Sequence, residues 1–305
     1  MNHPITVTHR HGESITVESD RTELMTYVYK PDPLEFESRK PYIHPLRTLS
    51  GNTVTGYRPN DHRWHKGLQM TASHVSGHNF WGGNTYVRGE GYLALPERVG
   101  SMRHEGFETF EVHPDELRFV ENLRWLDSGG GPWAFERREL RAHSVDPANG
   151  TWALDWSIRL TNTCDEPLRF GSPTTEGREM AGYTGLHWRG PREFTGGTVQ
   201  GPGTTGADAM MGARGRWLAF TGEHDEVDGH STVVFEHCPS NSESVHESHW
   251  FVRSDPTPAV AISWAFFEEF ELPGGESFEY TYRILIADGA LNHERIDRTL
   301  DEHPW

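Results

Sequence analysis

Residues 152–160, WALDWSIRL, place a large apolar side chain at every second position. Trp152, Leu154, Trp156, Ile158 and Leu160 would share one face of an extended chain, and polar side chains would take most of the other face. Because successive side chains of a strand point to opposite faces, this alternation predicts a strand with one buried face. Residues 278–286, FEYTYRILI, predict a second strand of the same kind.

Shorter segments with the same character surround these two strands. They are residues 24–29, 107–112, 119–125, 217–221, 232–235 and 260–266, and clusters of Gly, Pro, Asp and Asn separate them. Helical periodicity is nearly absent before the end, where Asn292 could cap a short helix through Ile296 and Leu300. The sequence therefore predicts an all-β protein, a large antiparallel β-sandwich with a short C-terminal helix, folded as one domain over residues 1–305.

The charge balance argues against several classes of partner. The formal net charge is −17, whereas nucleic acid and anionic membranes reward clustered Lys and Arg. No stretch approaches the length of a membrane helix, and the first residues lack the apolar core of a signal peptide. We therefore expect a soluble cytoplasmic protein that binds neither nucleic acid nor membranes. A homo-oligomer remains possible on these grounds.

The most unusual segment is rich in histidine and lies between residues 40 and 68. It contains KPYIHPLRTLSG (40–51) and PNDHRWHKGL (59–68), which bring His44, His62 and His65 close in sequence to Asp61. Neutral imidazole can act as a general base, imidazolium as an acid, and either nitrogen can bind metal. The alternative is that Asp61 caps a turn and the histidines lie on a solvated surface.

A second cluster occupies the glycine-rich residues 173–191, for which we expect a long loop. Arg178 and Arg189 could hold hydroxyl groups or a carboxylate, and Trp188 could stack on a sugar face. The alternative is a loop that is pinned by surface salt bridges.

A third group contains His249 and the acidic pair that follows the aromatic residues 266–267. Glu268 is a candidate general base if its surroundings are partly desolvated, because burial raises a carboxyl pKa. The alternative is an exposed strand end. The sequence has no phosphate-binding loop, dinucleotide fingerprint or nucleophile elbow, so it gives no support to ATP hydrolysis or to dehydrogenase chemistry.

Several of these segments resemble a bacterial family of unknown function once labelled "methane oxygenase PmoA". The resemblance runs from about Lys40 to Asp288, over KPYIHPLRTLSG, DHRWHKGL, HNFWGG, AGYTGLHWRGP, HWFVRSDP and ISWAFFEEFELPGGESFEYTYRILIADG. The family tends to occur beside sugar oxidoreductases and sugar-degrading proteins, which implies carbohydrate chemistry. Its expected fold is similar to the galactose mutarotase supersandwich, in which a His acid and a Glu base act on a sugar ring.

The resemblance also implies site residues. The motifs of the family fall on His44, Arg47, Asp61, His62, His65, His187, Arg189 and Glu268. Relatives carry GLFWRGP where this chain has His187, and a His where it has Phe267. The methane-oxygenase label does not fit a chain without a membrane-length apolar segment.

Together these observations lead to an acid/base enzyme that acts on a carbohydrate, by ring epimerisation or by proton abstraction beside a keto group, with elimination or hydrolysis as possible results. The expected catalytic residues are His62, His65, Glu268 and His187. The expected substrate-binding residues are His44, Arg47, Asp61, Lys66, Arg178, Trp188, Arg189 and His249.

Two other functions stay open at this point. One is a noncatalytic carbohydrate-binding sandwich that uses the same loops. The other is a metal-dependent lyase or oxygenase. No cofactor is expected, but a divalent metal would be held by His44, His62 and His65, with His187 or His249 as further candidates.

Overall fold

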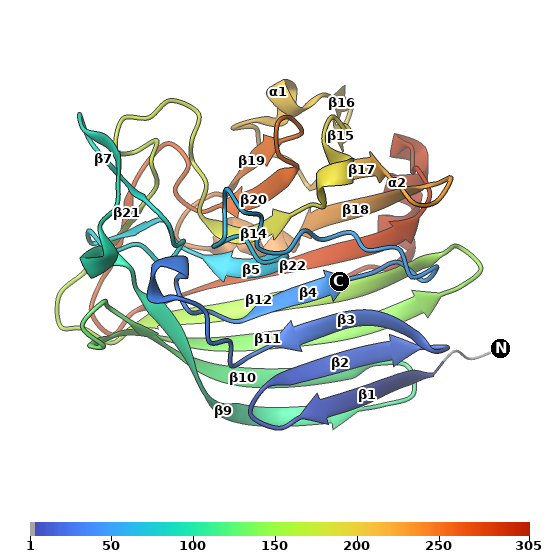
Figure 1. The fold of residues 1–305 in the computed structure, drawn as a ribbon, viewed down its shortest axis with the longest axis horizontal. Coiled ribbons are helices and arrows are strands. Elements are labelled where there is room, and N and C mark those ends of the chain that lie inside the picture. Colours follow the sequence, from blue (N-terminus) through green and yellow to red (C-terminus); the bar gives the residue numbers. More distant parts are fainter. Residues whose placement is uncertain (1–3) are drawn as a thin grey trace.

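The computed structural model describes residues 4–305, whose strands pair in two large antiparallel sheets. The sheets lie one behind the other in Figure 1, with the N-terminal strands at the lower edge. The first sheet has eight strands in the order β1 (Ile5–Arg10), β2 (Ser14–Ser19), β3 (Thr22–Val28), β4 (Tyr42–Leu46), β5 (Leu68–Thr71), β14 (Gly185–Arg189), β20 (Ala259–Ser263) and β19 (His249–Arg253).

The second sheet has nine strands. Their order is β16 (Thr204–Thr205), β15 (Thr198–Gly201), β17 (Trp217–Glu223), β18 (His230–His237), β22 (Ser277–Asp288), β12 (Thr151–Asn162), β11 (Pro132–Asp146), β10 (Leu117–Leu126) and β9 (Ser101–Val112). Smaller sheets join β21 (Phe270–Leu272), β13 (Leu168–Gly171) and β6 (His74–Val75), and pair β7 (Thr85–Val87) with β8 (Gly91–Leu93). Short helical segments are η1 (Glu35–Glu37), η2 (Pro96–Arg98), η3 (Arg192–Phe194), η4 (Pro239–Glu243) and α1 (Ala207–Met210).

The two strands with the clearest alternation form the middle of the nine-stranded sheet. β12 and β22 pair with each other, and Trp156 lies opposite Tyr282 in the register. Both side chains are fully buried between the sheets, where the core draws on strands of both layers. The predicted all-β sandwich is therefore confirmed, and the apolar side of each strand supplies its core.

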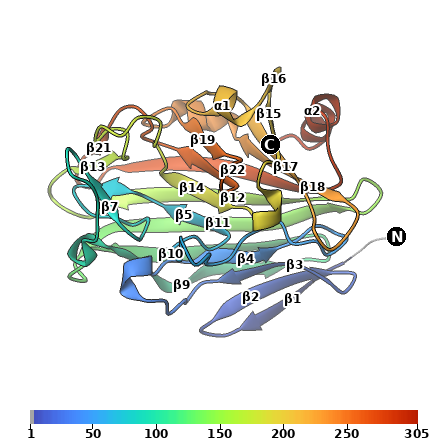
Figure 2. The same ribbon diagram turned by 45° about the horizontal axis from the view of Figure 1, so that its top comes forward.

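The predicted C-terminal helix is also confirmed. α2 spans His293–Glu302, and the side chain of Asn292 accepts a hydrogen bond of 2.9 Å from the backbone N–H of Arg295. Ile296 and Leu300 pack on Trp217 and other apolar side chains on the outer face of the nine-stranded sheet. Both ribbon views place the helix beside β17 and β18 (Figures 1 and 2). No helix of residues 4–305 is long and apolar enough to cross a membrane.

The prediction of a loop over residues 173–191 is wrong for the second half of that range. Gly185–Arg189 forms β14, an inner strand of the eight-stranded sheet between β5 and β20. All five residues of β14 are buried, because the sandwich core covers one face and loops cover the other. A strand that is buried on both faces need not alternate in hydrophobicity, so periodicity could not reveal it.

The core between the sheets contains a small group of buried charges. Arg138 donates a hydrogen bond of 2.7 Å to Glu136 and one of 3.1 Å to the hydroxyl of Tyr27. That hydroxyl donates to Glu121, which also accepts from His104 at 2.6 Å. Because each charge has a partner, the group satisfies the requirement for burying ions in a low-dielectric interior.

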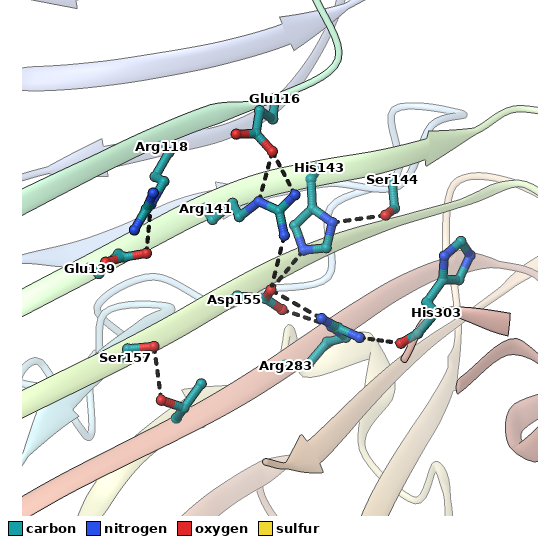
Figure 3. A network of polar contacts seen from close by, with 11 residues as sticks. Glu116, Arg118, Glu139, Arg141, His143, Ser144, Asp155, Ser157, Arg283 and His303 are labelled. Carbon is teal, nitrogen blue, oxygen red and sulfur yellow. Dashed lines mark hydrogen bonds and ion pairs between the residues drawn. The ribbon is translucent and has the colours of Figure 1, made fainter. Parts of the chain in front are cut away.

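A second polar network covers the outer face of the nine-stranded sheet (Figure 3). Asp155 accepts hydrogen bonds of 2.7 Å from Arg283 and 2.9 Å from His143, and Arg141 donates one of 2.8 Å to Glu116. Burial alone would raise the pKa of Asp155, but the hydrogen bonds from His143 and Arg283 hold that pKa below its ordinary value. Cationic and acidic groups of neighbouring strands thus neutralise each other across this face.

The buried charge group gives a test of the core. Replacement Glu136→Leu should lower the free energy of unfolding by about 3–5 kcal/mol, because it leaves Arg138 charged and buried without its closest carboxylate. The double variant Glu136→Leu with Arg138→Met should be more stable than the single variant in urea unfolding. A double variant as unstable as the sum of the two single losses would contradict this account.

Candidate functional site

The alternation of β14 separates the core from a candidate site. Leu186 and Trp188 belong to the core between the sheets, whereas His187 lines a cavity on the opposite face. Arg189 has the same parity as His187 and is also buried. A period of two thus directs two polar side chains away from the core and toward the loops.

Neighbouring strands continue this face. In the register His187 lies opposite Gln69 of β5 and Ala261 of β20, and Ala261 lies opposite Phe251 of β19. The next row runs from Arg189 through Ala259 to Arg253. Ala259 lines the cavity, and its small side chain leaves space between the larger side chains around it.

Loops complete a cavity of about 380 Å³ above this face. Its size lies within the range that is common for small-molecule sites. The walls combine histidines, aromatic rings, two arginines and one acid: Asp61, His62, Trp64, His65, Trp81, Asn84, Tyr92, Arg178, Tyr183, His187, Phe251, Arg253, Thr257 and Ala259.

Three imidazoles form a row along the cavity. The ring centroids of His62 and His65 lie 4.9 Å apart, and those of His65 and His187 lie 4.7 Å apart. His62 is half-buried, whereas His65 and His187 are buried. The row therefore runs from the solvent side into the interior.

Burial keeps these imidazoles neutral near pH 7. It lowers the pKa of His65 and of His187 well below the ordinary value, and nearby cationic and imidazole groups add to the effect. Burial also lowers the pKa of His62, although the carboxylate of Asp61 opposes the change. Both ring nitrogens of His187 are shielded from solvent and lack a hydrogen-bond partner among the described residues, so this imidazole is an unsatisfied polar group in the wall of the cavity.

The contact between Arg189 and His65 fixes a proton position. Nη1 of Arg189 lies 3.4 Å from Nδ1 of His65, and a guanidinium can only donate. Neutral His65 must then carry its proton on Nε2. In this state its Nε2–H is a hydrogen-bond donor, and the ring has no free lone pair with which to act as a base.

The carboxylate of Asp61 lies beside the outermost imidazole. Its Oδ2 lies 3.5 Å from Nδ1 of His62, and its Oδ1 lies 3.1 Å from Nη2 of Arg192. A carboxylate beside Nδ1 favours the tautomer with the proton on that nitrogen, which leaves the lone pair on Nε2. Nδ1 of His62 makes no hydrogen bond among the described residues, so Asp61 favours this tautomer of His62 through its charge.

Aromatic rings form the other walls. Trp81 lies 4.5 Å from His187 and 4.5 Å from Tyr183 between ring centroids, and Tyr183 lies 5.5 Å from Phe251. The hydroxyls of Tyr92 and Tyr183 are 2.7 Å apart. Flat apolar faces beside hydroxyl and imidazole groups suit a ligand that has both C–H faces and hydroxyl edges.

Two buried lysines and the half-buried Arg58 support the loops from the side away from the cavity. Lys66 pairs with Glu37 at 2.9 Å, and Arg58 donates to the same carboxylate at 2.6 Å. Nζ of Lys40 donates to the carbonyl of Trp81 at 2.8 Å. The side chain of Lys66, an expected substrate contact, is buried against Glu37 and holds the loop in place.

Several expected substrate-binding residues lie outside the cavity lining. Trp188 is fully buried, and its Nε1 donates to the carbonyl of Val54, so it cannot stack on a ligand. His44 stacks on the ring of Tyr57 with a centroid distance of 5.0 Å, and burial lowers its pKa to about 4. Arg47 donates to Thr53 at 2.6 Å. All three side chains therefore make contacts within the protein and do not face the cavity.

The third expected group is also separate from the cavity lining. The side chain of Glu268 is 82% exposed, and its Oε2 lies 3.9 Å from His246. The carboxylate therefore lies in solvent, and the partly desolvated surroundings expected for a base at this position are absent. His249 accepts a hydrogen bond of 3.1 Å from Arg214. Neither residue lines the cavity with His62 and His65.

The structure thus brings together Asp61, His62, His65, Arg178 and His187 around the cavity, with Arg189 behind His65. Sequence reasoning did not select the aromatic walls, in particular Trp81, Tyr92 and Phe251. The glycines of residues 78–83, HNFWGG, are the sequence feature that could have indicated this wall. A Cβ on Gly83, which has φ +71°, would lie 2.5 Å from the ring of Trp64. Glycine is thus required where that loop approaches Trp64.

The proposed metal ligands do not converge. Within residues 4–305 there is no group of three or more His, Cys, Asp or Glu side chains arranged to hold a metal ion. His44 donates to or accepts from Thr55 at 2.9 Å and does not line the cavity, so the expected set of His44, His62 and His65 is not assembled.

The model of a family of unknown function, DUF6807, matches residues 14–301. The solved structures to which the chain is similar include galactose 1-epimerase from Lactobacillus acidophilus NCFM, at 10% identity and a TM-score of 0.43, covering 94% of this chain and 98% of that chain. No curated protein matches.

Two further solved structures are similar at the same level. One is a galactose mutarotase related enzyme from Lactobacillus acidophilus, at 8% identity and a TM-score of 0.37, covering 95% of this chain and 98% of that chain. The other is a polysaccharide lyase, at 10% identity and a TM-score of 0.33, covering 99% of this chain and 35% of that chain. These scores are too low to carry an argument about activity. The methane-oxygenase label expected with the resemblance is not part of the matched family's description.

The unpartnered imidazole of His187 gives a test by stability. Replacement His187→Phe should raise the free energy of unfolding by about 1–3 kcal/mol, because it removes two buried polar atoms that have no partner. The matched control is His224→Phe, whose ring nitrogens contact Glu193 at 2.8 Å and Ser231 at 2.7 Å. The control should lower stability in the same urea titration. Destabilisation of similar size in both variants would contradict this reading of His187.

Proposed function

The chain belongs to the DUF6807 family of unknown function, and we propose that it is an acid/base enzyme that removes a proton from a sugar, at a carbon beside a keto group. The observation that carries the proposal is the row of neutral imidazoles in an aromatic cavity, with Asp61 beside the outermost ring. His62 and His65 have separate parts in the reaction.

The lining of the cavity supports a sugar as the substrate. Trp64 and Trp81 offer flat faces, and the side chains of Asn84, Tyr92 and Tyr183 offer polar groups for hydroxyls. A sugar ring presents apolar C–H faces and polar edges, which such a mixture of groups can match.

The protonation states favour proton abstraction over ring opening by an acid. Although burial raises it, the pKa of Asp61 is held below its ordinary value by a backbone hydrogen bond, by His62 and by Arg192. The imidazoles are neutral, so the cavity lining offers proton acceptors and N–H donors at pH 7 but no carboxylic acid. Protonation of a ring oxygen would require a stronger acid than these groups supply.

The reaction balances with the residues at hand. The lone pair on Nε2 of His62 accepts the proton from the carbon beside the keto group, and the C–H electrons form a C=C bond. The carbonyl electrons move onto oxygen, and Nε2–H of His65 donates to the resulting enolate. Transfer of this proton from His62 to a departing hydroxyl or alkoxyl group on the next carbon gives elimination, whereas epimerisation needs a second proton donor on the opposite face of the sugar.

Isotope exchange tests this proposal directly. Keto-sugars incubated with the protein in D₂O should exchange the proton beside the carbonyl, which proton NMR detects as a loss of signal. Replacement His62→Gln should slow the exchange by about 10²–10⁴-fold, the usual contribution of a general base. The matched control His237→Gln changes a histidine of β18 in the other sheet and should leave the rate unchanged.

Exchange that survives in His62→Gln would refute the assignment of the base. Saturable sugar binding without exchange of any proton would instead favour the noncatalytic carbohydrate-binding sandwich. In that case binding should depend on Trp64 and Trp81, since Trp188 is buried in the core.

The pH dependence gives a second test. A base must be neutral to act, and burial lowers the pKa of His62 below 6.5. The acid limb of kcat/KM should therefore lie below pH 6.5. Asp61→Asn removes a charge that raises the pKa of His62, so the acid limb should move to still lower pH while kcat falls. A limb that moves to higher pH would contradict the pairing of these residues.

A further inference from the structure

Two arginines line one side of the cavity without a carboxylate partner. Arg178 lies over the ring of Tyr92, with 4.8 Å from Cζ to the ring centroid, and donates to its hydroxyl. Arg253 lies over the ring of Phe251 at 5.4 Å. Among the described residues, neither guanidinium forms an ion pair, although both are half-buried.

This arrangement differs from the outer face of the nine-stranded sheet. That face pairs Arg118 with Glu139, Arg141 with Glu116 and Arg283 with Asp155 (Figure 3). The chain has 45 acidic residues against 28 Lys and Arg, so acidic partners are abundant. Two unpaired guanidiniums on the wall of one cavity are therefore a local excess of positive charge in an acidic protein.

The excess of positive charge on the cavity wall is unfavourable in the absence of a ligand. Burial lowers the pKa of Arg253, and the charge of Arg178 lowers it further. Arg253 also acts on His62, since its charge contributes to the lowered pKa of that imidazole. A negative group between the two arginines would relieve their repulsion, because opposite charges stabilise each other strongly in a partly desolvated site.

We infer that the sugar bound in this cavity carries an anionic substituent, a carboxylate or a phosphate, which is held by Arg178 and Arg253. The inference rests on the proposed function for the sugar itself and adds the charge of the substrate. The aromatic rings behind the two guanidiniums fix their planes and leave N–H edges free for the oxygens of the anion. Arg189 remains engaged with His65 and has no part in this contact.

Binding measurements test the inference without requiring turnover. Titration with glucose, galactose, glucuronate, galacturonate and glucose 6-phosphate can be followed by isothermal calorimetry at low salt. An anionic sugar should bind at least tenfold more tightly than its neutral counterpart. The preference should weaken as the salt concentration rises, because salt screens charge interactions. The uronates and the phosphate separate the two possible sources of negative charge.

Variants assign the preference to the two residues. Arg253→Gln and Arg178→Gln should each reduce the preference for the anionic sugar about tenfold and leave neutral-sugar affinity within about twofold. The matched control Arg159→Gln removes one positive charge from β12, where Arg159 pairs with Glu279 at 3.2 Å on the surface. The control should leave every affinity unchanged.

The outcomes separate this inference from the proposed function. Equal affinity for neutral and anionic sugars, or a preference that survives both arginine variants, would overturn the inference and leave proton exchange on neutral keto-sugars unaffected. Tight binding of an anionic sugar with no proton exchange on any keto-sugar, charged ones included, would support the inference and refute the catalytic proposal. Failure of every sugar to bind would refute both.

Discussion

The site depends on the burial of polar side chains on one face of β14. The strand cannot move His187 and Arg189 into the apolar core without moving Leu186 and Trp188 out of it, because a one-residue shift reverses every side chain. Loops then cover the polar face and remove its water. His187 and Arg189 are therefore buried with nitrogens that have no hydrogen-bond partner, which is energetically unfavourable and uncommon in folded proteins.

The loops that cover this face are themselves anchored by buried charges. Glu37 receives both Lys66 and Arg58, and Lys40 donates to backbone carbonyls of Glu37, Ser38 and Trp81. These contacts fix the segment that carries Asp61 to His65 against the segment that carries Trp81. A rigid support of this kind lets three imidazoles keep their spacing and their neutral state in the absence of a ligand.

The two sheets differ in how completely their charged side chains are paired. On the outer face of the nine-stranded sheet, acidic and basic side chains of neighbouring strands pair directly, and no charge is left for a ligand. Around the cavity, Arg178 and Arg253 stack on aromatic rings and form no ion pair with a described residue. Asp61, the acidic residue of the lining, forms an ion pair with Arg192. The two arginines of the cavity wall are therefore available to a negatively charged ligand.

The sequence by itself determined the strands whose two faces differ. Alternation in residues 152–160 and 278–286 specified β12 and β22, and Asn292 specified the start of α2, because each signal is local. It also singled out Asp61, His62 and His65, since so many ionisable groups in a short loop are unusual. Only the tertiary structure decided that β14 is a strand, that Trp188 lies in the core and that Glu268 lies in solvent. The burial of these residues depends on contacts between segments that are far apart in the chain, and a local pattern of residues does not specify such contacts.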